Sequence, residues 1–112
     1  MSVEPIPNSY WGIPGTFAAG EYPGAKSGAA ARAKLSELLL AGIRVFVDLT
    51  EEGELLPYAD LLQRESARIG VRTEWHRMPI PDVSIPSLSD MTRIQRTIAR
   101  AIQQERPVYV HC

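Results

Sequence analysis

The chain has 112 residues, of which 45% are hydrophobic and 22% are charged, and its formal net charge is −1. A chain of this length can form at most one domain. The balance of apolar and charged residues excludes a disordered protein. A net charge near zero gives no indication of binding to nucleic acid or to an anionic membrane surface.

The chain contains one cysteine, Cys112, so it cannot form an internal disulfide and makes no demand on an oxidising compartment. Its longest apolar runs are 38–41 and 45–47, far shorter than the roughly 20 residues that span a bilayer. The first residues have neither the basic region nor the apolar stretch of a signal peptide. We therefore expect a cytoplasmic protein with no membrane partner.

The first 15 residues are rich in proline and glycine and predict an irregular segment. Tyr10 and Trp11 are expected to pack this segment against the domain, because aromatic side chains bury the most area per residue. Thr16–Tyr22 then predicts a short strand that ends at the turn pair Pro23-Gly24.

The next stretch predicts a helix over Ser27–Ala41. Ser27 is a good N-cap residue, and Gly42 can adopt the left-handed conformation that ends a helix. The apolar residues expected on the inner face of this helix are Ala31, Leu35, Leu38 and Leu39. Ile43–Leu49 follows as an almost continuous apolar run, which is typical of a parallel strand covered on both faces.

A loop over Thr50–Pro57 comes next, followed by a second predicted helix over Tyr58–Ile69 that Gly70 ends. The inner stripe expected for this helix consists of Tyr58, Leu61, Leu62, Glu65 and Ile69. Val71–Met78 is more polar and predicts a strand nearer the edge of the sheet.

Three prolines within Met78–Ser87 exclude a helix or a central strand there. A third helix is expected to begin at Ser87 or Ser89 and to run to about Arg106. Its apolar stripe consists of Met91, Ile94, Ile98, Ala101 and Ile102. Pro107 ends this helix, and the short apolar strand Val108–Val110 follows.

Strands and helices thus alternate along the chain, which predicts an α/β fold with a largely parallel central sheet flanked by helices. Ligands of such sheets bind beyond the carboxyl ends of the strands, and His111 and Cys112 lie at such an end. A cysteine there is a candidate nucleophile, provided that its pKa is lowered from about 8.5, since only the thiolate attacks.

The His111-Cys112 pair resembles the start of the phosphate-binding loop, His-Cys-x5-Arg-Ser/Thr, of the cysteine-based protein tyrosine phosphatases. The chain is most similar to their dual-specificity-like branch. The pattern that supports this branch consists of Trp11, Pro14, Gly15, Gly20, Pro23, the pair Pro81-Asp82 and the pair Pro86-Ser87. The resemblance implies a phosphatase fold and a phosphorylated protein or small phosphoester as substrate, with no cofactor.

The resemblance also implies residue roles. Cys112 would attack phosphorus and form a cysteinyl-phosphate, and His111 would order the phosphate loop and help to set the state of the thiol. Asp82 would act as the general acid, because the leaving alkoxide or phenoxide must be protonated, and would then activate water. The sequence does not indicate an oligomeric state or which phosphoresidue is preferred.

Only the first two residues of the phosphate loop are present in the 112 residues, and the loop arginine is absent. We therefore expect residues 1–112 to be a single, incomplete dual-specificity-phosphatase-like domain, truncated after the strand that carries Cys112 and inactive alone. We expect the chain to be a fragment of a longer protein.

Each candidate residue has a structural alternative. Cys112 could be a small buried hydrophobic residue. A metal site is disfavoured, because the second histidine, His76, has no partner at a recognisable ligand spacing. Asp90 could compete with Asp82, although its position favours an interaction with a helix N-terminus. Asp48 is expected to be a structural carboxylate that anchors a loop.

Two further alternatives concern the function of the whole chain. A pseudophosphatase would keep the fold and bind phosphorylated partners without turnover. A rhodanese-like sulfur transferase would also place a cysteine at a strand end, but it needs no acid on a proline-rich loop. The carboxylates of Glu51, Glu52 and Glu54 are expected to be solvated loop residues and not a filter for substrate charge.

Overall fold

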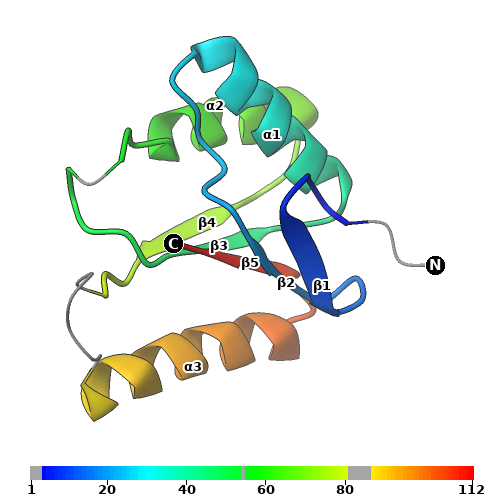
Figure 1. Cartoon of the computed structure of the whole chain (residues 1–112). Coiled ribbons are helices and arrows are strands. Elements are labelled where there is room, and N and C mark those ends of the chain that lie inside the picture. Colours follow the sequence, from blue (N-terminus) through cyan, green and yellow to red (C-terminus); the bar gives the residue numbers. More distant parts are fainter. Residues whose placement is uncertain (1–3, 54, 81–86) are drawn as a thin grey trace.

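The computed structural model describes residues 4–53, 55–80 and 87–112. Within these ranges the chain forms five strands and three helices (Figure 1). The strands are β1 (Ser9–Ile13), β2 (Phe17–Gly20), β3 (Val45–Asp48), β4 (Glu74–Arg77) and β5 (Val108–His111), and the helices are α1 (Gly28–Leu40), α2 (Ala59–Ile69) and α3 (Leu88–Gln103).

All five strands belong to one sheet in the order β1-β2-β5-β3-β4. The strands from β2 to β4 are parallel, and only β1 pairs antiparallel, with β2. Helices α1 and α2 cover one face of the sheet, and α3 covers the other (Figure 1). The predicted α/β fold with a largely parallel sheet is confirmed, and β5 is its central strand.

The helix ends are fixed largely by local chemistry. The Ser27 side chain accepts a hydrogen bond from the Ala30 amide at 3.1 Å, and Ser87 caps α3 in the same way by accepting from the Asp90 amide at 3.0 Å. Ser87, and not Ser89, is therefore the cap of α3. No helix in the described ranges is both long and apolar enough to cross a bilayer.

Helix α3 ends at Gln103, earlier than the predicted Arg106. Glu105 adopts a left-handed conformation (φ 58°), and the Arg106 amide donates back to the Ala101 carbonyl at 2.9 Å. This arrangement is a Schellman motif, which closes a helix by satisfying its last carbonyls. This helix end could not be predicted from the sequence, because glutamate is not typical of the left-handed position.

The expectation of an irregular first segment is wrong, because Ser9–Ile13 forms the edge strand β1. A tight turn through Pro14 and Gly15 (φ 72°) reverses the chain, and the Thr16 amide donates to the Ile13 carbonyl at 2.9 Å. Proline followed by glycine is favoured in such a turn, because glycine alone adopts a positive φ without strain.

The expected packing of Tyr10 is also wrong. Alternation along the edge strand turns Tyr10 outward, where 62% of it is exposed, while Trp11 packs against the core. The buried anchor of the segment is Ile6, which the sequence analysis did not single out.

The two faces of the sheet carry different cores. The core under α1 and α2 contains large side chains, and its fully buried members include Leu35, Leu38, Phe46, Leu62 and Tyr109. The core under α3 is built from Val45, Val47, Ala101 and Val108. The predicted inner stripes of α1 and α2 are confirmed at their buried positions, whereas Met91 of the α3 stripe is exposed.

Candidate active site at the carboxyl edge of the sheet

Cys112 directly follows β5 and is exposed to solvent. Because β5 is the central strand and its neighbours β2 and β3 run parallel to it, Cys112 lies where the carboxyl ends of three strands meet (Figure 1). This edge of a parallel sheet is where ligands bind.

The strand alternation sorts side chains to the two faces. In β5, Val108 packs in the core under α3, whereas Tyr109 packs in the core under α1 and α2. His111 therefore lies on the α1/α2 face, as does Asp48 at the end of β3. The sheet register places four residues side by side in the last row, namely Gly20, His111, Asp48 and Arg77.

The next row on the same face, two residues back along each strand, is apolar and aromatic. Its members, in the same strand order, are Ala18, Tyr109, Phe46 and Trp75. All four belong to the core under α1 and α2 or pack against it. The polar side chains of the last row therefore pack against an aromatic layer, and this packing restricts how far they can move.

His111 is buried, and its Nε2 forms a hydrogen bond of 2.6 Å with the Tyr58 hydroxyl. The Asp48 carboxylate lies 3.9 Å from the same nitrogen. Burial lowers the pKa of His111 to about 4, although the Asp48 charge and a backbone hydrogen bond with Cys112 act in the opposite direction. His111 is thus a neutral imidazole near pH 7, directly before the thiol.

The same environment raises the pKa of the Tyr58 hydroxyl well above its usual value. Burial is the main cause, and the negative charge of Asp48 adds to it. The hydroxyl therefore keeps its proton and can donate to the neutral His111 ring. A hydrogen bond between two buried neutral groups carries a smaller desolvation cost than one that involves a charged group.

Asp48 is almost completely buried and holds the loop that follows β3. One oxygen accepts from the Thr50 amide at 2.9 Å and from the Thr50 hydroxyl, and the other accepts from the Trp75 indole at 3.2 Å. Arg77 lies 3.7 Å from the carboxylate and stacks over the Trp75 ring at 5.1 Å. The prediction that Asp48 anchors a loop is confirmed, and its contact with His111 adds it to the site.

The start of the proline-rich segment is held at the same edge. The Met78 amide donates to the Asp48 carbonyl at 2.8 Å, and the Ile80 amide donates to the Leu49 carbonyl at 3.0 Å. Asp82, the predicted general acid, lies outside the described residues. Asp90 is in the first turn of α3, as predicted, where its amide is bound by the Ser87 cap.

Sequence reasoning missed Tyr58 as a member of this site. It assigned Tyr58 only to an apolar helix stripe, where its ring does belong, since it packs edge-on against Phe46 at 6.3 Å. The available signal was the hydroxyl of a tyrosine on the inner stripe, because a buried tyrosine hydroxyl needs a partner. The identity of that partner, 53 positions away, follows only from the fold.

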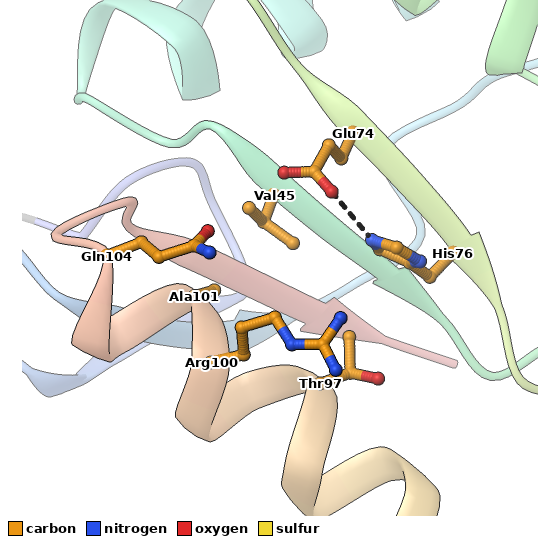
Figure 2. A pocket seen from close by; sticks show the side chains of 7 residues that line it. All are labelled: Val45, Glu74, His76, Thr97, Arg100, Ala101 and Gln104. Atoms are coloured by element: carbon orange, nitrogen blue, oxygen red, sulfur yellow. Dashed lines mark hydrogen bonds and ion pairs between the residues drawn. The ribbon is translucent and has the colours of Figure 1, made fainter.

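A second group of polar residues lies between β4 and α3 (Figure 2). Glu74 and His76 project from β4 and form a hydrogen bond of 3.3 Å, and Arg100 and Thr97 face them from α3. The cavity between them has a volume of only about 40 Å³. Val45 and Glu74 are the first residues of β3 and β4. This cavity therefore lies toward the amino ends of the strands, whereas Cys112 lies at their carboxyl ends.

In the part of the chain that the structure describes, no three histidine, cysteine, aspartate or glutamate side chains gather closely enough to hold a metal ion. Glu51 and Glu52 are exposed, as expected of solvated loop residues, and Glu54 lies outside the described residues.

Comparison with known proteins supports the phosphatase interpretation. A family described as Tc-R-P, polymorphic toxin system, DSP-PTPase phosphatase, matches residues 19–112. None of the curated proteins matches the chain. The family match does not favour the rhodanese-like alternative.

Several solved structures share the fold. A mutant form of Tk-PTP is 25% identical and covers 95% of this chain with a TM-score of 0.65. A putative phosphatase (DUF442) from Shewanella putrefaciens CN-32 is 16% identical and covers 99% with a TM-score of 0.70, and kinase associated phosphatase (KAP) is 19% identical and covers 85% with a TM-score of 0.63.

The chain spans 61%, 60% and 55% of the length of these three structures, respectively. The family match nevertheless covers most of the chain, from β2 through the strand that carries His111 and up to Cys112. The chain belongs to the DSP-PTPase phosphatase family of polymorphic toxin systems, within the dual-specificity-like branch of the cysteine-based tyrosine phosphatases.

Proposed function

We propose that these residues form the amino-terminal part of one dual-specificity-phosphatase-like domain, which hydrolyses phosphomonoesters on phosphorylated proteins. Phosphotyrosine is the first candidate substrate, with phosphoserine and phosphothreonine next. The observation that carries the proposal is the exposed cysteine at the carboxyl end of the central strand, in a chain of this family.

The proposed reaction has two steps. The Cys112 thiolate forms a bond to phosphorus while the bond from phosphorus to the leaving oxygen breaks, and Asp82 gives its proton to that oxygen. In the second step Asp82 accepts a proton from water, whose oxygen displaces the cysteine sulfur from phosphorus. The products are the dephosphorylated hydroxyl, inorganic phosphate and the regenerated thiolate.

The role proposed for His111 is to position the thiol. Its ring is held by Tyr58, and burial lowers its pKa to about 4, so the ring is uncharged near pH 7 and too weak a base to take the thiol proton. The Asp82 assignment is supported by its neighbour in sequence, Ile80, whose backbone is bound at the same edge as His111.

In the related loop motif, His-Cys-x5-Arg-Ser/Thr, a bidentate arginine binds the phosphate. Residues 1–112 include only the histidine and the cysteine of this motif. We therefore expect a polypeptide of these residues alone to show no turnover. By extension from the family description, the complete protein would act within a polymorphic toxin system.

The test is hydrolysis of a generic aryl phosphate by the complete protein that contains these residues. Cys112→Ser should abolish turnover, because a serine hydroxyl is not ionised near neutral pH. Asp82→Asn should lower kcat by about 10²–10⁴-fold and leave binding of a phosphate analogue intact. Asp90→Asn is the matched control, since it removes a carboxylate at the start of α3 and should leave kcat unchanged.

Turnover by Cys112→Ser would overturn the proposal. A wild-type protein that binds the analogue without turnover would be a pseudophosphatase. If Asp90→Asn and not Asp82→Asn lowered kcat, the general acid would have to be reassigned. A thiosulfate–cyanide assay separates sulfur transfer from phosphoryl transfer.

A further inference from the structure

A large apolar cavity lies among the loops that follow β2 and β3. Its volume is about 590 Å³, and it is lined by Tyr22, Ala25 and Lys26 from the first loop and by Gly53, Leu55, Leu56 and Pro57 from the second. Leu55 is 39% exposed and Leu56 is 57% exposed. Two adjacent exposed leucines on a concave surface suit the capture of an apolar group.

This cavity borders the candidate active site, and two tyrosine rings lie between them. Tyr22 lines the cavity, and its ring centroid lies 6.0 Å from that of His111, the residue before Cys112. Tyr58 directly follows the cavity residue Pro57, and its ring lies 5.8 Å from Tyr22 and 5.3 Å from His111. A group bound in the cavity is therefore separated from the thiol-bearing strand end by a single layer of rings.

The wall of the cavity that comes from the first loop is fixed before any partner binds. The Lys34 ammonium group donates to the Tyr22 carbonyl at 3.4 Å and to the Gly24 carbonyl at 3.3 Å, and it forms a salt bridge of 3.1 Å with Glu21. Gly24 packs so closely on Tyr22 that an added Cβ would lie 2.3 Å from the hydroxyl oxygen. Preorganised walls favour recognition, because little conformational freedom is lost on binding.

We propose that this cavity is a specificity subsite that receives an apolar side chain flanking the phosphoresidue of a phosphorylated protein substrate. The inference rests on the proposed function, because it places the phosphate at Cys112. The contact of the cavity residue Tyr22 with His111 favours a side chain close to the phosphoresidue over a remote docking segment, and the mainly apolar lining with two exposed leucines selects leucine or phenylalanine over polar residues.

The experiment compares two phosphotyrosine peptides that differ only in the residues flanking the phosphotyrosine, leucine in one and serine in the other. For the complete protein, kcat/KM should be about tenfold higher for the leucine peptide, the discrimination typical of an apolar pocket. The double variant Leu55→Ser/Leu56→Ser should lose this preference and should hydrolyse a small aryl phosphate at the wild-type rate. Leu40→Ser is the matched control, because Leu40 is an exposed leucine at the end of α1, away from the cavity.

Equal kcat/KM for the two peptides with the wild-type protein would overturn the subsite, as would a preference that survives in the double variant. If the aryl phosphate is not hydrolysed at all, the proposed function fails. The subsite is then judged by binding of the two peptides to the Cys112→Ser protein, followed by fluorescence anisotropy. Tighter binding of the leucine peptide that depends on Leu55 and Leu56 supports it, and equal binding refutes it.

Discussion

The two faces of the sheet are packed differently, and the candidate site lies on only one of them. The face under α1 and α2 holds large buried rings, including Phe46 and Tyr109, whereas the face under α3 is built mainly from valines and an alanine. His111 and Asp48 are on the first face, directly beyond those rings. A catalytic group is held precisely only when its neighbours are packed, so the ring-filled face positions the site.

The largest expected effect comes from removing a ring from that face. Phe46→Ala should lower the free energy of unfolding by about 3–5 kcal/mol, because it deletes a fully buried ring and leaves a cavity. Val47→Ala, the next residue on the opposite face, should cost only about 1–3 kcal/mol. Urea unfolding of both variants measures the difference, and equal losses would contradict the contrast between the faces.

The second prediction concerns pH. Because the folded state lowers the pKa of His111 from 6.5 to about 4, the unfolded chain binds more protons between these values. The contribution of His111 to the free energy of unfolding should therefore be fully present above pH 6.5. It should fall by roughly 3 kcal/mol as the pH decreases toward 4. His111→Asn should show a shallower decrease over the same window in urea unfolding.

A direct measurement is available for the case in which His111→Asn fails to fold. The ring resonances of His111 in the wild-type protein, followed by NMR as the pH is lowered, should titrate near 4. Titration near 6.5 would show that the ring is solvated, and the proposed neutral, buried imidazole would then be wrong.

A smaller effect is expected from the hydroxyl that holds the imidazole. Tyr58→Phe keeps the ring on the packed face but removes the hydrogen bond to His111, which leaves a buried ring nitrogen without this partner. The free energy of unfolding should fall by about 1–3 kcal/mol. Tyr10→Phe is the control, because Tyr10 is 62% exposed and its hydroxyl should contribute little. Equal effects of the two variants would argue against the Tyr58–His111 contact.

The smallest predicted effects are at the helix caps, one on each face. Ser27→Ala at α1 and Ser87→Ala at α3 should each lower the free energy of unfolding by about 1 kcal/mol. Hydrogen exchange sharpens the comparison. In Ser87→Ala the faster exchange should stay within the first turn of α3, while in Ser27→Ala it should follow global unfolding, because α1 is packed more tightly. The reverse pattern would contradict the ordering of the two faces.

Much of the fold follows from local features of the sequence. The order of elements from β2 onward, the serine cap of α1 and the inner stripes of α1 and α2 were predicted, because caps and periodicity act within a few residues. The edge strand β1 was missed, since a short segment flanked by prolines and glycines becomes a strand only by pairing with β2. The end of α3 was missed because Glu105 adopts a conformation usually reserved for glycine.

The candidate site was predicted in part. His111 and Cys112 were identified from their place after an apolar run, and the structure places Cys112 directly after β5. The catalytic roles of Cys112, His111 and Asp82 stay predictions. Tyr58 was assigned to the core alone, because a helix stripe reveals which side chains face inward but not which strand they meet.

By itself, the sequence determined that strands and helices alternate and that the last strand delivers a histidine and a cysteine to its carboxyl end. These features depend on short-range patterning and on chain order. Only the tertiary structure decided that His111 lies between Gly20 and Asp48 in one row and is hydrogen-bonded to Tyr58, the N-cap residue of α2. Such contacts join residues tens of positions apart, so they depend on strand order and register, which are set by packing of the whole domain.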